Sequence, residues 1–138
     1  MIKKDFMKEI ENSLKIVKRE VDKNIINGNI SEAKEAINNQ LKGLVGLDIM
    51  TIDTLSFSSV IDIISREDEF NGERYIALGE LLCLQGFVCQ STGDEEGQIK
   101  YYLKSIDALN GAFMEDSDIE KRYFQDGIHI SDLLSVYD

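Results

Sequence analysis

The 138-residue chain contains no proline. Proline removes a backbone donor and breaks helices, so a chain without it has nothing to interrupt long helices and no rigid linker. The length is that of one domain, and 43% apolar with 30% charged residues is typical of a globule with a packed core. We therefore expect residues 1–138 to form a single all-α domain.

Apolar residues recur every three or four positions along most of the chain, which places them on one face of an α-helix. Gly28 and Gly93 are predicted to end the helices that precede them, and Ser31, Ser56 and Asp94 to cap those that follow. No segment alternates apolar and polar residues with the period of a strand. The predicted helices cover residues 4–26, 32–46, 57–65, 72–92, 95–113 and 119–136, with one short helical turn in the irregular segment 47–56.

Large apolar residues are expected to form the inner face of each helix. In the first helix they make a seam with heptad spacing from Met7 to Val21, and Asn24 continues its register. The seam is too short for a free coiled coil, so packing inside the chain is expected. In the helix over 95–113, the residues predicted to face inward are Ile99, Tyr102, Leu103, Ile106 and Leu109.

The net charge is −11 and is unevenly distributed: residues 1–24 carry +2, and residues 25–138 carry −13. A surface this acidic repels phosphate, which argues against nucleic-acid binding and against anionic membranes. The basic first helix either contacts an acidic partner or lies on the acidic remainder of the chain.

The most apolar stretch, Tyr75 to Cys89, is too short to span a membrane and contains Glu80. The N-terminus lacks the apolar run of a secretory signal. Cys83 and Cys89 fall on one predicted helix with Cα atoms about 9 Å apart, from the helical rise, which is too far for a disulfide. These observations predict free, buried thiols and a cytoplasmic location.

Residues 79–112 resemble one tetratricopeptide repeat, a helix–turn–helix unit of about 34 residues. Leu82 and Gly86 match the large residue and the glycine of the first helix, residues 93–94 match the turn, and Tyr102 matches the aromatic residue of the second helix. The segment departs from the repeat pattern at Gln85, Gln98, Ser105 and Asn110.

Residues 28–41 resemble the turn and second helix of the same repeat, with Ala33 and Ile37 at matching positions. The two copies lie 65 residues apart, so a degenerate helix pair would stand between them. The resemblance implies antiparallel helical hairpins in a tetratricopeptide-like right-handed array of about five to six helices.

In tetratricopeptide proteins the first helix of each pair lines a concave groove that takes peptides. Some members clamp a terminal carboxylate with a lysine and an asparagine one turn apart, but here Lys18 faces Asp22, which would neutralise the clamp. The groove is either open or filled by the helix predicted over 119–136. The groove positions that the resemblance implies are Lys15, Lys18, Asp22, Glu80, Cys83, Phe87 and Gln90.

The sequence shows no workable catalytic constellation. Its single histidine, His129, shares a predicted helix face with Asp126 and Asp132, a trio that could orient a base or bind a metal weakly. The same residues are equally typical of a solvated helix face. No phosphate-binding or dinucleotide fingerprint is present. We therefore expect no catalytic residues, no metal and no cofactor.

Three hypotheses of function follow. The first is a non-enzymatic adaptor that binds a peptide or helix of an unknown partner protein on a tetratricopeptide-like concave face around Phe87. The second is a structural protein that forms a homodimer through its N-terminal helix. The third is a metal-assisted or acid–base enzyme around His129.

Overall fold

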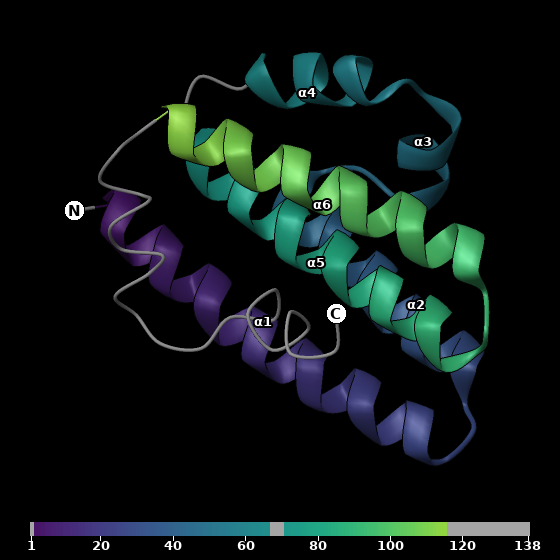
Figure 1. Ribbon diagram of the computed structural model, residues 1–138. Helices are drawn as coiled ribbons and strands as arrows, with labels where there is room; N and C mark the ends of the chain where they lie inside the picture. The colour runs from purple at the N-terminus through teal and green to yellow at the C-terminus, as the bar shows by residue number, and fades with distance from the viewer. Residues whose placement is uncertain (1, 67–70, 116–138) are drawn as a thin grey trace.

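The computed structural model describes residues 2–66 and 71–115, and every regular element in them is helical (Figure 1). The expectation of an all-α chain is confirmed for these residues. The helix predicted over 119–136 lies outside them. In chain order, the elements are α1 (Ile2–Ile26), α2 (Ile30–Gln40), the π-helical turn η1 (Leu41–Val45), α3 (Ile49–Thr54), α4 (Phe57–Ser65), α5 (Asn71–Ser91) and α6 (Glu95–Glu115).

Local signals set most of the helix ends. Gly28 and Gly93 adopt φ angles of 78° and 77°, left-handed conformations that glycine tolerates best. The Ser56 hydroxyl accepts a hydrogen bond from the Ser59 amide, and an Asp94 carboxylate oxygen accepts one from the Gly97 amide at 3.0 Å. The predicted caps Ser56 and Asp94 are therefore confirmed.

Two details of the second helix differ from the prediction. It begins at Ile30 with Asn29 at the N-cap position, so Ser31 lies inside the helix and does not cap it. Its last turn is the π-helical turn η1, which ends at Gly46 with a φ of 90°. η1 contacts α5 and contributes buried side chains to the core, namely Leu41, Leu44 and Val45.

The central element is α5, which contacts α1, α2, η1, α4 and α6. Its side chains are buried on every side of the helix between Tyr75 and Gly86. A helix that is apolar all round must be enclosed by neighbours to keep that surface from water. In Figure 1, α5 accordingly lies among α1, α2, α4 and α6.

α5 and α6 lie side by side and run in opposite directions (Figure 1). A Cβ added at Gly79 would lie 2.7 Å from Leu109 Cγ, and one added at Gly86 would overlap the Tyr102 ring. The buried Ser105 hydroxyl donates a hydrogen bond of 2.7 Å to the Gly79 carbonyl. Two glycines on α5 therefore make room for side chains of α6.

The predicted seam of α1 is part of this core. Ile10, Leu14, Val17 and Val21 are all buried, and α1 contacts α2 and α5. Asn24, which continues their register, is half-buried. The apolar seam thus packs against other helices of the same chain, as its short length predicts.

Candidate functional site

The residues that the tetratricopeptide resemblance assigns to a groove lie on α1 and α5, two helices that contact each other. Three of them come together. Lys18 Nζ lies 2.6 Å from Asp22 Oδ2, and it also lies 5.4 Å from the centroid of the Phe87 ring. The ion pair satisfies the charge of Lys18, in line with the expectation that Asp22 neutralises a carboxylate clamp.

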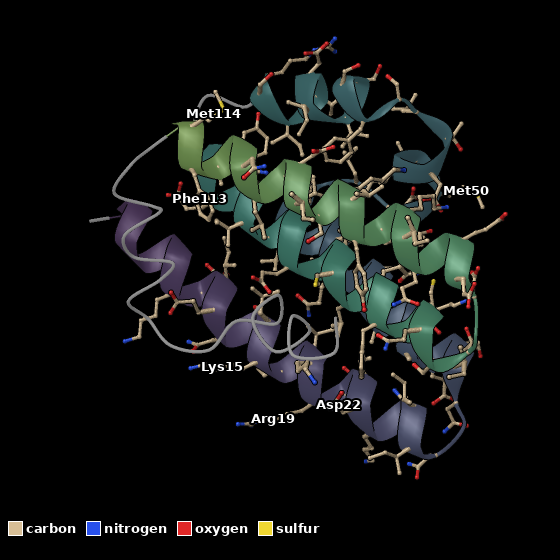
Figure 2. The ribbon with its side chains drawn as sticks, in the orientation of Figure 1. Lys15, Arg19, Asp22, Met50, Phe113 and Met114 are labelled. Atoms are coloured by element: carbon tan, nitrogen blue, oxygen red, sulfur yellow. The ribbon has the colours of Figure 1, made fainter. Side chains whose placement is uncertain are left out.

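The other predicted groove residues do not join this cluster. Lys15 is exposed and points away from the other helices (Figure 2). Glu80 and Cys83 are only 1% and 5% exposed, so they offer almost no surface to a peptide. Gln90 is exposed, and its side-chain oxygen accepts a hydrogen bond of 3.0 Å from the Tyr102 hydroxyl. The groove predicted from the resemblance is therefore reduced to a small patch around Phe87.

A different surface, on α6, gathers three of the large apolar side chains that the described helices expose. The side chains of Ile99, Leu103 and Ile106 are 60%, 59% and 53% exposed. They stand at positions i, i+4 and i+7 and so form one continuous ridge, which we call the α6 stripe. The prediction that these three residues face inward is wrong, whereas it holds for Leu109, which is buried.

The orientation of α6 follows from its close contact with α5. The glycines of α5 leave space that two large side chains of α6 fill, Leu109 at Gly79 and Tyr102 at Gly86. The buried face of α6 combines large and small residues, and the face that carries the α6 stripe turns outward. Tyr102 lies at the boundary, half-buried against Gly86. The residues of α6 on its buried side are Tyr101, Ser105, Ala108, Leu109 and Ala112.

A polar cluster between α3 and α6 also fixes this orientation. The Tyr101 hydroxyl donates a hydrogen bond of 2.7 Å to Asp53 Oδ2. Lys100 Nζ and Lys104 Nζ lie 3.6 and 3.9 Å from Asp53 Oδ1, and Lys104 Nζ also reaches the Ile52 carbonyl oxygen at 3.5 Å. The cluster holds both lysines of α6 beside Asp53.

Burial changes the ionisation of this cluster. It raises the pKa of Tyr101, and the hydrogen bond and negative charge of Asp53 raise it further. Burial lowers the pKa of Lys104, against the opposing effect of Asp53. The Tyr101 phenol is therefore held in its protonated form, in which it can donate to Asp53 but cannot act as a base.

The two thiols are arranged for packing. Cys83 and Cys89 form no disulfide with each other, and both are buried. Burial raises the pKa of the Cys89 thiol, and the nearby Asp94 carboxylate acts in the same direction. Since the thiolate is the reactive form of cysteine, these environments suppress nucleophilic chemistry.

Residues 2–66 and 71–115 contain no group of three or more His, Cys, Asp or Glu side chains placed to hold a metal ion. The trio Asp126, His129 and Asp132 lies outside this part of the chain. α1 and α2 do enclose a polar cleft of about 340 Å³. Its lining mixes carboxylates, amides and one lysine: Glu20, Lys23, Asn24, Glu32, Glu35 and Asn39, with Ala36.

Of the helices that the structure describes, none combines the length and the apolar character needed to cross a bilayer. The chain matches no protein-family model, and neither a curated protein nor a solved structure is significantly similar to it.

Proposed function

We propose that this protein is a non-enzymatic interaction module that binds a helix or peptide segment of another protein. The observation that carries the proposal is the α6 stripe, because Ile99, Leu103 and Ile106 leave a contiguous aliphatic ridge in water. Single exposed apolar residues are common on soluble proteins, but contiguous apolar patches mark interaction sites. Burying an exposed leucine or isoleucine side chain contributes about 1.5–3 kcal/mol, so covering the stripe would stabilise a complex substantially.

The tetratricopeptide-like concave face is a second candidate surface for the same function. The close approach of α5 and α6 at Gly86 supports the resemblance to that repeat. On this face a peptide could meet Phe87, which is half-buried beneath the Lys18 ammonium, and the exposed Gln90. This patch is smaller and more polar than the α6 stripe, so we place the main binding surface on α6.

Self-association through the first helix has less support. The apolar seam that would form such a dimer is buried against α2 and α5. Dimerisation through it would require α1 to leave the core, which would expose Ile10, Leu14, Val17 and Val21 to water. An acid–base enzyme finds no support among the described residues, where Tyr101 is held protonated and both thiols are buried.

Site-directed photo-crosslinking in the cells that produce the protein tests the proposal. A benzophenone amino acid is placed at Leu103 in the stripe, at Phe87 in the concave patch, or at Ile16. Ile16 is the matched control, because it is 60% exposed like Ile99 but has no other exposed large apolar residue within one turn of α1. Crosslinks from residue 103 to a defined protein, absent from residue 16, are expected.

The captured protein is then identified by mass spectrometry, purified and titrated against wild type and Leu103→Gln. Binding at least about tenfold weaker to Leu103→Gln is expected, since a buried leucine contributes about 1.5–3 kcal/mol. Crosslinks from residue 87 alone would move the site to the concave face. Equal crosslinking from residues 16 and 103 would overturn the assignment of the binding site to α6. Equal affinity of the partner for wild type and for Leu103→Gln would also overturn it.

A further inference from the structure

The surroundings of the α6 stripe are acidic, and this indicates what kind of partner it fits. Glu95 and Glu96 lie one helical turn before Ile99, and Asp107 lies one turn after Leu103. All three carboxylates are exposed, and none forms an ion pair among the described residues. We call these three residues the acidic rim.

The lysines of α6 do not cancel the rim. Lys100 and Lys104 both lie within 4 Å of Asp53, with 46% and 17% of their side chains exposed. Their positive charge is therefore directed to α3, on the flank of α6 next to the core. The remainder of the chain reinforces the negative field, because residues 25–138 carry −13.

The shape of the stripe fits a helix. Ile99 to Ile106 spans about 10 Å along the axis of α6, from the helical rise. A partner helix with apolar residues at i, i+3 or i+4, and i+7 presents a ridge of the same length. Lysine or arginine beside that ridge would reach Glu95 and Glu96 at one end of the stripe and Asp107 beside its other end.

Building on the proposed function, we propose that the α6 stripe binds an amphipathic helix whose apolar face is flanked by lysine and arginine side chains. A second copy of this chain is a poorer occupant. It would bring another net charge of −11 and another acidic rim to the same contact, and like charges across an interface oppose association.

Synthetic peptides test this inference with the full-length protein. The basic probe is an 18-residue helical peptide with leucine at i, i+3, i+4 and i+7 and flanking lysines. The acidic probe has glutamate in place of every lysine, and the scrambled probe has the composition of the basic probe without its apolar face. Fluorescence anisotropy gives each affinity at low and at high salt. We expect the basic probe to bind at least about tenfold more tightly than either other probe.

Three variants locate the contact. The stripe variant combines Ile99→Gln, Leu103→Gln and Ile106→Gln. The rim variant combines Glu95→Gln, Glu96→Gln and Asp107→Asn. The remote variant removes the same number of charges from the cleft between α1 and α2, through substitution of Glu20, Glu32 and Glu35 by glutamine.

We expect the stripe variant to lose at least about tenfold in affinity for the basic probe. The rim variant should lose about three- to tenfold and most of the salt dependence, whereas the remote variant should stay within about twofold of wild type. Circular dichroism spectra like that of wild type establish that each variant is folded.

The outcomes separate this inference from the proposed function. If the acidic probe binds the stripe as tightly as the basic one, or the rim and remote variants lose equally, the basic partner is wrong and the interaction surface stands. If the stripe variant binds the basic probe like wild type, both are wrong. A dimer in sedimentation equilibrium that the stripe variant dissociates, or an intramolecular crosslink from residue 103 to residues 116–138, would overturn the inference by assigning the stripe to a second copy or to this chain.

Discussion

The Tyr102 ring lies against the Cα of Gly86 and fills the space that a side chain at residue 86 would occupy. The contact sits where α5 and α6 approach closely, and it ends in a hydrogen bond from the Tyr102 hydroxyl to Gln90 on α5. The pair thus fixes both the distance between the two helices and the rotation of α6. That rotation turns Ile99, Leu103 and Ile106 toward solvent.

Gly86→Ala should lower the free energy of unfolding by about 1–3 kcal/mol, because the new methyl group overlaps the Tyr102 ring. Urea denaturation measures the loss. Gly43→Ala is the matched control: Gly43 is exposed in η1, and an added Cβ meets no atom within 4 Å. It should be neutral or stabilising by up to about 1 kcal/mol, from the higher helix propensity of alanine. Equal losses from both substitutions would contradict the close contact.

A double-mutant cycle tests whether the two residues act on each other. Tyr102→Ala removes the ring and is destabilising alone, but it also frees the space beside residue 86. Gly86→Ala should therefore be less destabilising in the Tyr102→Ala background, with a coupling of about 0.5–3 kcal/mol. If the losses in free energy of unfolding are strictly additive, the methyl group at residue 86 overlaps atoms other than those of the Tyr102 ring.

Substitutions on the two faces of α6 should differ sharply in their effect on stability. Leu103→Gln changes an exposed side chain and should alter the free energy of unfolding by less than about 0.5 kcal/mol. Leu109→Gln places an amide in the contact with Gly79 and should remove about 2–5 kcal/mol. Thermal denaturation followed by circular dichroism compares them. A large loss for Leu103→Gln would mean that this face is covered in the folded protein.

Stability should fall as the pH rises above about 10, the ordinary pKa of tyrosine. The pKa of Tyr101 is higher in the folded protein than in the unfolded chain, so the folded state binds the phenolic proton more tightly. Its contribution is complete below the unfolded pKa and is lost as the pH rises toward the folded one.

Tyr101→Phe provides the control for this pH dependence. The variant lacks the phenol, so its stability should decline less steeply with pH than that of wild type, and the difference between the two proteins isolates Tyr101 from the other titrating groups. Urea denaturation at several pH values between 8 and about 11 spans the onset of the decline. Parallel profiles would contradict the hydrogen bond to Asp53.

The thiols should react with a disulfide reagent slowly in the folded protein and rapidly in urea, because Cys83 and Cys89 are buried and burial raises the pKa of Cys89. Absorbance of the released chromophore follows the reaction. The variants Cys83→Ala and Cys89→Ala show which reaction rate belongs to which thiol. Fast reaction of both thiols without denaturant would show that the α5–α6 contact opens readily.

The sequence by itself determined the helical class and most helix boundaries of the described residues, because these depend on neighbours in the chain. The left-handed glycines Gly28 and Gly93 and the capping side chains of Ser56 and Asp94 act within one helical turn. The burial of the α1 seam followed from its periodicity, which marks one face for the core. The π-helical turn η1 has no such local signal.

Only the tertiary structure decided which side of α6 faces the core. Periodicity favours the face with the most large aliphatic residues, but the glycines of α5 leave space that Leu109 and Tyr102 fill, and this packing buries the opposite face of α6. Likewise, the burial of Glu80 and Cys83 depends on the helices that surround α5 on every side. The candidate site was therefore missed from the sequence, because the hydrophobicity of α6 alone does not show where α5 leaves space for its side chains.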